Sequence, residues 1–266
     1  MKKYILCFNV LLSFILSLLL SSCNNKSNIS FELNSDDTYR VVSVDTSLKS
    51  IFIPKEYNNK PVTKIGNNAF KGSKIESLII PSNIEEIGDN AFDGCSELVT
   101  LFMNKNLKKI GNFAFSSCNR LKSISLPDTL EEIGSFAFIY CYRIEELTIP
   151  NSVISIGVGA FMHMENLTKV TLSNSISKIE ENTFLGCKQL ESINIPSSVT
   201  ILGNKCFYDC NKLATLYLPK SVKEIGSDII STVDNLKIYY GGLESDYELI
   251  QNESKEIINK YIICKA

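Results

Sequence analysis

The chain has 266 residues, of which 44% are hydrophobic and 21% are charged, and its formal net charge at pH 7 is −2. This composition is too apolar for an intrinsically disordered chain, and the small negative charge gives no general attraction for nucleic acid. With one histidine and no tryptophan, the chain cannot form a histidine-rich metal site, and a serine or cysteine triad would have to use His163.

Residues 1–22 have the organisation of an export signal. Lys2 and Lys3 precede a mainly apolar stretch from Tyr4 to Leu20, which is short for a helix that spans a membrane. The next residues, Leu20-Ser21-Ser22-Cys23, resemble a bacterial lipobox, in which small residues precede a lipid-accepting cysteine. The resemblance implies that 1–22 is a lipoprotein signal peptide, that Cys23 is lipidated, and that 23–30 is a lipid-anchored polar tether. The alternative is an ordinary signal peptide in which Cys23 has no role.

The segment 31–47 is expected to form an N-terminal β cap. Apolar and polar residues alternate from Phe31 to Val44, and Asn34 to Asp37 are turn-forming residues. Together they predict a β-hairpin that covers the first unit of the structure that follows.

A repeat of 23 residues occupies 48–235. Residues 121–143 read LKSISLPDTLEEIGSFAFIYCYR and 144–166 read IEELTIPNSVISIGVGAFMHMEN, which share the pattern L-x-x-I-x-L-P-x-x-L-x-x-I-G-x-x-A-F-x-x-C. One column of phenylalanines recurs every 23 residues after a first interval of 22: Phe70, Phe92, Phe115, Phe138, Phe161, Phe184 and Phe207. The pattern predicts about eight rungs.

Each part of the repeat predicts a local structure. Ile124 and Leu126 alternate with serines, which indicates a short strand with one buried face. Pro127 has no N–H and ends this strand, and Gly134 permits a backbone that a Cβ would resist. Ala137-Phe138, followed by Cys141, indicates a tight helical or 3₁₀ turn around a buried phenylalanine.

A single rung cannot bury enough apolar surface to be stable alone, so the rungs must stack. We therefore expect a β-rich solenoid in which each rung contributes a short parallel strand and a tight turn. Leu236 to Tyr240 predicts a last strand, and a loose set of apolar residues between Asp246 and Ile263 predicts a helix. Residues 236–266 should thus form a C-terminal strand and helical cap.

The repeat resembles the BspA-like class of bacterial leucine-rich repeats. The motif L-x-x-I-x-[IL]-P, followed by I-G-x-x-A-F-x-x-C, carries the resemblance from about Leu48 to Tyr240, and Ile53 to Phe70 is similar to the longer first repeat of that family. The resemblance implies a solenoid of the leucine-rich-repeat type and an extracytoplasmic protein associated with adhesion and protein binding. It identifies no ligand, because function depends on the surface and not on the fold.

Five of the nine cysteines occupy one position of the repeat: Cys95, Cys118, Cys141, Cys187 and Cys210. Met164 and Val233 fill the same position in other rungs, so we interpret these cysteines, and also Cys206, as core residues. Disulfides between rungs and a metal site are the alternatives, and Cys264 has no interpretation.

No group of residues predicts catalysis. His163 follows Phe161 in the tight turn, where an exposed side chain is expected, and the glycines are spread one per rung instead of clustering around a phosphate. We predict that the protein is not an enzyme and needs no cofactor and no metal. The same turns are expected to expose a small apolar cluster of Ile139, Tyr140 and Met162.

The candidate partner-binding residues form one outward-facing column of the predicted strands. The column begins with three apolar residues and becomes hydroxylated: Phe52, Ile79, Phe102, Ser125, Thr148 and, near the other end, Tyr217. Contiguous exposed apolar residues often mark contacts with a partner. The alternative is that the N-terminal hairpin or the long first repeat covers the apolar three.

These features predict a lipid-anchored, extracytoplasmic binding module of the bacterial cell envelope. If its function is adhesion, it would lie on the cell surface. Its sheet face would hold a protein or glycoprotein ligand, for example a host extracellular-matrix protein, while the N-terminal lipid alone contacts the membrane. The alternative is an inward-facing structural or scaffold lipoprotein of the envelope without a host ligand. No nucleic-acid partner is expected.

Overall fold

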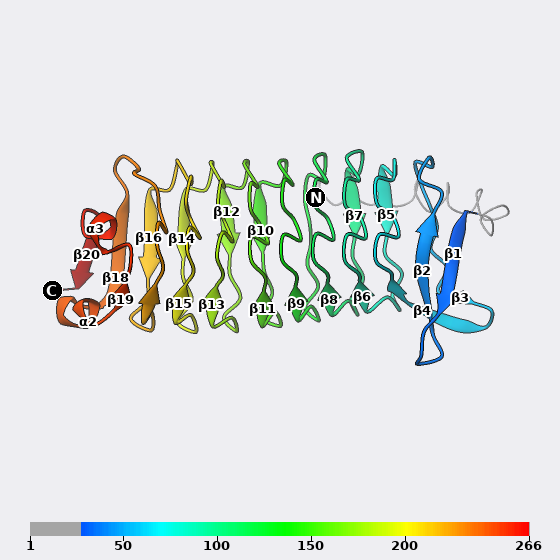
Figure 1. Cartoon of the computed structure of the whole chain (residues 1–266), viewed down its shortest axis with the longest axis horizontal. Helices are drawn as coiled ribbons and strands as arrows, with labels where there is room; N and C mark the ends of the chain where they lie inside the picture. The colour runs from blue at the N-terminus through cyan, green and yellow to red at the C-terminus, as the bar shows by residue number, and fades with distance from the viewer. Residues whose placement is uncertain (1–27, 266) are drawn as a thin grey trace, which may run out of the picture.

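The computed structural model describes residues 28–265, so the expected signal peptide and Cys23 lie outside the described residues. The described chain winds into an elongated β-solenoid of about ten turns (Figure 1). Paired residues of neighbouring rungs are mostly 23 apart, as in Leu78 with Leu101 and Ile133 with Ile156, which confirms the predicted rung.

The N-terminal end is closed by the predicted hairpin, formed by β1 (Ile29–Leu33) and β2 (Tyr39–Val44). β2 also pairs in parallel with β4 (Lys60–Ile65), so the hairpin continues the sheet of the solenoid. The long first repeat adds β3 (Glu56–Tyr57), which folds back on β4. Its Tyr57 stacks on Phe31 with a centroid separation of 4.3 Å and holds this insertion against the hairpin.

Two sets of parallel strands run along the solenoid. The outward side of the first set, which we call the long-strand face, belongs to β5 (Ser77–Ile79), β7 (Thr100–Phe102), β10 (Glu146–Thr148), β12 (Lys169–Thr171), β14 (Ser192–Asn194), β16 (Thr215–Leu218), β18 (Lys237–Leu243) and β20 (Ile262–Lys265). The second set, the short strands, continues β2 and β4 with β6 (Glu86–Ile87), β8 (Lys109–Ile110), β9 (Glu132–Ile133), β11 (Ser155–Ile156), β13 (Lys178–Ile179), β15 (Ile201–Leu202), β17 (Glu224–Ile225) and β19 (Gln251–Asn252).

The tight turns form a third set of hydrogen bonds between rungs, which we call the tight-turn ladder. In the first full rung the backbone N–H groups of Asn68, Phe70 and Gly72 donate to carbonyls of the next rung at 2.7–2.9 Å. The phenylalanine N–H of every later rung, as far as Phe207, does the same. The short strands donate in the opposite direction, as Gly88 N–H does to the Ile65 carbonyl at 2.8 Å.

Residues on both sides of each buried phenylalanine have a left-handed backbone, for example Asn68 (φ 60°) and Gly72 (φ 68°). The turn contains the 3₁₀-type bond expected from the sequence, from Ser73 N–H to the Phe70 carbonyl at 2.9 Å. It does not propagate as a helix, because the left-handed residues turn alternate N–H groups towards the next rung. Asparagine and glycine are common at these positions because they adopt this conformation at low cost.

One apolar core runs through the described chain from Ile29 to Ile258. The predicted phenylalanine column is fully buried, and its successive rings are stacked, with centroids from 4.7 Å apart at Phe70–Phe92 to 5.9 Å apart at Phe138–Phe161. A chain that begins at Asn24 therefore keeps the whole of this described core.

The glycine column lets neighbouring rungs approach each other closely. A Cβ on Gly134 would lie 2.5 Å from the carbonyl carbon of Gly111 and 2.6 Å from the nitrogen of Asn112. Glu180 replaces this glycine in one rung, and there the pairing of the short strands stops between β11 and β13. A side chain at this position thus coincides with the loss of backbone pairing.

The C-terminal cap differs from the single helix expected over 246–263. Two short helices, α2 (Glu244–Glu248) and α3 (Lys255–Ile258), alternate with β19 and β20. β19 pairs with β17 and β20 pairs with β18. The prediction of one helix is wrong because the last repeat has two strands, β17 and β18, whose outer backbone groups need hydrogen-bond partners. An uninterrupted helix would leave these groups unpaired.

The close approach at the glycine column predicts that Gly134→Ala lowers the free energy of unfolding by about 1–3 kcal/mol, the usual cost of overpacking. Urea unfolding followed by circular dichroism measures the loss. Gly241→Ala is the control, because a Cβ on Gly241 would meet its nearest atom, the nitrogen of Lys220, at an ordinary contact distance of 3.4 Å. A Gly134→Ala variant as stable as the original chain would contradict this role of the glycines.

Candidate functional site

The structure gathers the apolar part of the predicted binding column on the long-strand face. Ile79 pairs with Phe102 across β5 and β7, and the side chains of Phe52 and Phe102 are 45% and 39% exposed. Neither the hairpin nor the first-repeat insertion covers them, because Tyr57 of the insertion packs against Phe31 and Tyr39 instead. The three residues are thus open to a partner.

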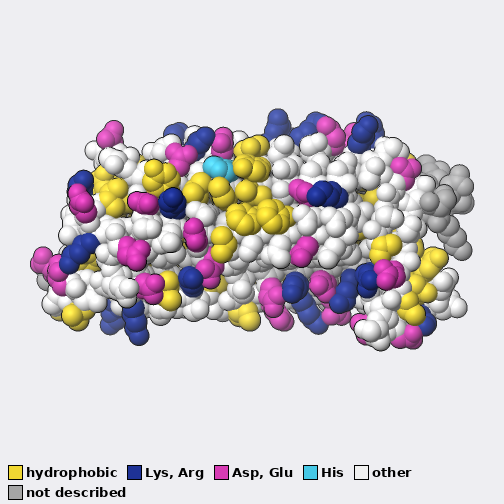
Figure 2. All heavy atoms as spheres, viewed as in Figure 1, with side chains coloured by type: hydrophobic (Ala, Val, Ile, Leu, Met, Phe, Trp, Pro, Cys, Tyr) yellow, Lys and Arg dark blue, Asp and Glu magenta, His cyan; other side chains and the backbone are white. Residues whose placement is uncertain are grey.

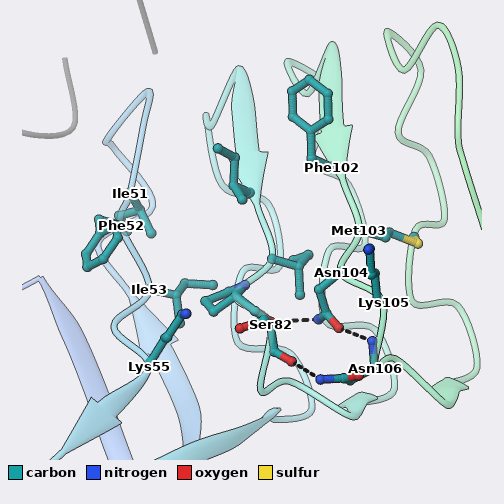
Figure 3. A pocket seen from close by; sticks show the side chains of 13 residues that line it. Ile51, Phe52, Ile53, Lys55, Ser82, Phe102, Met103, Asn104, Lys105 and Asn106 are labelled. Atoms are coloured by element: carbon teal, nitrogen blue, oxygen red, sulfur yellow. Dashed lines mark hydrogen bonds between the residues drawn. The ribbon is translucent and has the colours of Figure 1, made fainter. Parts of the chain in front are cut away.

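These residues border a hollow of about 540 Å³ on the outer surface of three successive rungs. Phe52 and Phe102 stand on opposite sides of it, and β5 lies between them (Figure 3). Its remaining apolar lining comes from Ile51, Ile53, Ile79, Ile80, Pro81 and Met103. We call this the apolar hollow.

Side-chain amides fix the lower wall of the apolar hollow. Asn104 stands where most rungs have proline, and its buried amide donates to the carbonyls of Pro81 at 2.7 Å and Ile84 at 3.0 Å. The Asn106 amide donates to the Ser82 carbonyl at 2.6 Å (Figure 3). Bonds that join two rungs at this point hold the hollow in one shape.

Two lysines supply the charge of the apolar hollow. Lys55 and Lys105 line it, and their side chains run from the lower wall towards Ile53 and Met103 (Figure 3). The lining contains no aspartate or glutamate. The hollow is therefore apolar and cationic, although the whole chain is slightly acidic.

The rest of the predicted column is polar until the far end of the solenoid. Ser125 and Thr148 are exposed and do not line the apolar hollow. Tyr217 is 48% exposed and stacks on Tyr239 at 5.3 Å, with Ile263 of β20 beside Tyr239 in register. The sequence interpretation missed Tyr239 and Ile263 because it assigned them to a cap, although Tyr239 continues the column after an interval of 22.

A second exposed cluster lies on the tight turns, with different members from those expected. Ile139 is only 7% exposed, so its inclusion in an exposed cluster was wrong. The exposed rings of Phe113 and Tyr140 instead stack on half-buried rings, Phe113 on Phe136 at 5.0 Å and Tyr140 on His163 at 5.3 Å. Figure 2 shows hydrophobic side chains gathered beside the histidine in the middle of one side of the molecule.

The seven cysteines of the described range are free, which excludes disulfides among them. Five donate their S–H to a buried phenylalanine carbonyl of a preceding rung, as Cys141 does to Phe115 at 3.2 Å. Burial raises the pKa of Cys141 and of Cys187 to about 12. These thiols remain protonated, and Cys264 packs at the edge of the C-terminal core.

No group of three or more His, Cys, Asp or Glu residues between 28 and 265 is placed to hold a metal ion. In the same range no helix is long and apolar enough to cross a membrane.

Stacked rungs with parallel strands, a phenylalanine column and an open strand face define a leucine-rich-repeat solenoid, a fold that typically serves as a non-enzymatic binding scaffold. The description "BspA type Leucine rich repeat region" matches residues 44–158 and 131–253, with six copies of the repeat. The chain belongs to this BspA-type family, which is often involved in protein binding.

Two solved structures of bacterial leucine-rich-repeat proteins are similar to the chain. One, from T. pallidum, is 26% identical, with 71% of this chain and 89% of that chain covered and a TM-score of 0.66. The other, from Bacteroides ovatus, is 27% identical, with 80% and 70% covered and a TM-score of 0.61. No curated protein matches the chain.

The raised thiol pKa values predict a loss of stability at alkaline pH. The unfolded chain ionises its thiols from about pH 9, whereas the folded chain keeps Cys141 and Cys187 protonated until about pH 12, so the free energy of unfolding falls between these values. Each thiol contributes a slope of about 1.4 kcal/mol per pH unit. In urea unfolding from pH 8 to 10, the double variant Cys141→Ala/Cys187→Ala should lose less stability than the original chain.

Met164→Ala is the matched control, because Met164 fills the same repeat position without an ionisable group. It should keep the original slope. A double cysteine variant with an unchanged slope would disprove the contribution of these thiols.

Proposed function

We propose that the protein is a lipid-anchored, extracytoplasmic binding module that holds a protein or glycoprotein ligand on its long-strand face. The observation that carries this proposal is the apolar hollow, where two half-exposed phenylalanines border a shaped surface of about 540 Å³. Binding energy at protein interfaces is concentrated in a few such aromatic and apolar positions.

The far end of the same face supplies a second contact. Tyr217 and Tyr239 project from the column five and six rungs beyond Phe102, which places Tyr217 about 24 Å from it at a strand spacing of about 4.8 Å. The exposed positions between them are polar, as Ser125 and Thr148 are. A ligand that lies along the solenoid would thus meet apolar contacts at both ends and a polar surface in between, which is the composition of a protein interface.

The anchor is inferred from the sequence at Leu20–Cys23. A lipidated N-terminal cysteine that carries two or more acyl chains holds a protein firmly on a membrane. The module would then be displayed on the extracytoplasmic side of the bacterial envelope, and a host extracellular-matrix protein is the ligand that surface display would favour.

The first test measures binding of the chain that begins at Asn24 to a panel of immobilised extracellular-matrix proteins. We expect at least one to bind, and Phe102→Ser to weaken this binding about tenfold or more, because it removes an interface anchor. Ser125→Ala, on the same column, should have no effect. The adhesive function fails if no matrix protein binds above background.

The second test concerns the anchor. Cells that express the full chain should incorporate radiolabelled palmitate into it, and Cys23→Ala should remove the label, because the acylated group is this thiol. Protease treatment of intact cells should degrade a surface-displayed chain. Full protection would instead support an inward-facing envelope lipoprotein, and label retained by Cys23→Ala would eliminate the anchor.

A further inference from the structure

We propose that the apolar hollow recognises an acidic, apolar segment of the protein ligand. An apolar side chain would enter between Phe52 and Phe102, and carboxylates on either side of it would bind Lys55 and Lys105. This inference rests on the function proposed above and adds the chemistry of the ligand.

The shape of the hollow suits a side-chain anchor. Its volume of about 540 Å³ lies within the range of about 300–1,000 Å³ usual for ligand pockets. Its base is made of buried isoleucines, such as Ile53 and Ile80, which offer an inserted group no hydrogen-bonding side chain. The hydrogen bonds that the Asn104 side-chain amide donates join two rungs, so the wall of the hollow needs little ordering when a ligand binds.

The charges of the hollow are available to a ligand. Several lysines elsewhere on the solenoid are neutralised by carboxylates of neighbouring rungs: Lys49 by Glu76 at 2.7 Å, Lys64 by Glu86 at 2.9 Å and Lys108 by Glu85 at 2.8 Å. Neither Lys55 nor Lys105 forms an ion pair within the part of the chain that the structure describes. Asp128, at the position equivalent to Lys105 one rung further, does not line the hollow.

The spacing of the lysines sets the ligand pattern. Lys55, Ser82 and Lys105 occupy equivalent positions in three successive rungs, so the lysines are about 10 Å apart at a strand spacing of about 4.8 Å. In an extended peptide alternate residues face the same side, at about 3.3 Å per residue. The pattern Glu-x-Phe-x-Glu therefore directs the phenylalanine into the hollow and both carboxylates towards the lysines, whose flexible stems adjust to the remaining difference.

The test titrates the chain that begins at Asn24 into the labelled peptide Ser-Glu-Ser-Phe-Ser-Glu-Ser, with capped ends, and follows fluorescence anisotropy. Two control peptides replace both glutamates by glutamine or the phenylalanine by serine. We expect each control to bind about tenfold more weakly, and the affinity of the acidic peptide to fall with added salt, because exposed ion pairs are screened.

Variants assign the binding to the hollow. The double variant Lys55→Gln/Lys105→Gln should bind the acidic peptide about tenfold more weakly than the original chain does, and this affinity should depend little on salt. Its affinity for the glutamine peptide should be unchanged. Lys220→Gln is the matched control, because Lys220 occupies the same repeat position outside the apolar hollow. Circular dichroism checks that each variant is folded.

Equal affinity of the acidic and glutamine peptides, or an unchanged affinity of the double lysine variant, would overturn the proposal. So would saturable binding of dodecanoate at Phe102 without any binding of the acidic peptide, since the hollow would then take a small amphiphile. If a matrix protein depends on Phe102 but not on the two lysines, this inference fails and the proposed function stands. If the acidic peptide binds as expected but no matrix protein does, the adhesive function alone fails.

Discussion

The hydrogen-bond ladder of the tight turns is the constraint on which the rest of the solenoid depends. It joins every rung from Phe70 to Ile229, whereas the long strands are unpaired around residues 121–126 and the short strands are unpaired between β11 and β13. Left-handed residues on both sides of each phenylalanine aim the N–H groups along the axis, and the buried ring fills the space beneath them. This fixes the rung spacing, and the glycine column is a consequence because it removes the side chains that the spacing cannot accommodate.

A fixed spacing converts the sequence into surface columns. Residues one repeat apart become neighbours, so three apolar residues in one column become the border of the apolar hollow. Substitutions at single repeat positions then give each part of the face its chemistry. Asn104 in a proline position supplies the amide that joins two of the first rungs, and Lys55 and Lys105, each in the position after the proline column, supply the charge of the hollow. A common scaffold can in this way carry a site that belongs to a few rungs only.

Periodicity was sufficient to predict the solenoid, the buried phenylalanines and the core placement of the cysteines, because each depends on a position that recurs. Properties that depend on backbone conformation or on neighbours outside the repeat were not predictable in the same way. The burial of Ile139, the strands of the C-terminal cap and the extension of the binding column to Tyr239 and Ile263 are examples. The residues of the apolar hollow were identified as an apolar patch, but its depth and its two lysines became evident only when three rungs were placed side by side.

The interruptions of the two strand sets fall at different rungs. Between Phe70 and Ile229, every junction of neighbouring rungs therefore retains the tight-turn ladder together with at least one set of strand pairs. These bonds run along the long axis, so a stretching force applied from one end to the other loads at least two sets of them together at each of these junctions. A ligand held at one end of the column and an attachment at the other would thus load no junction on one set of bonds alone.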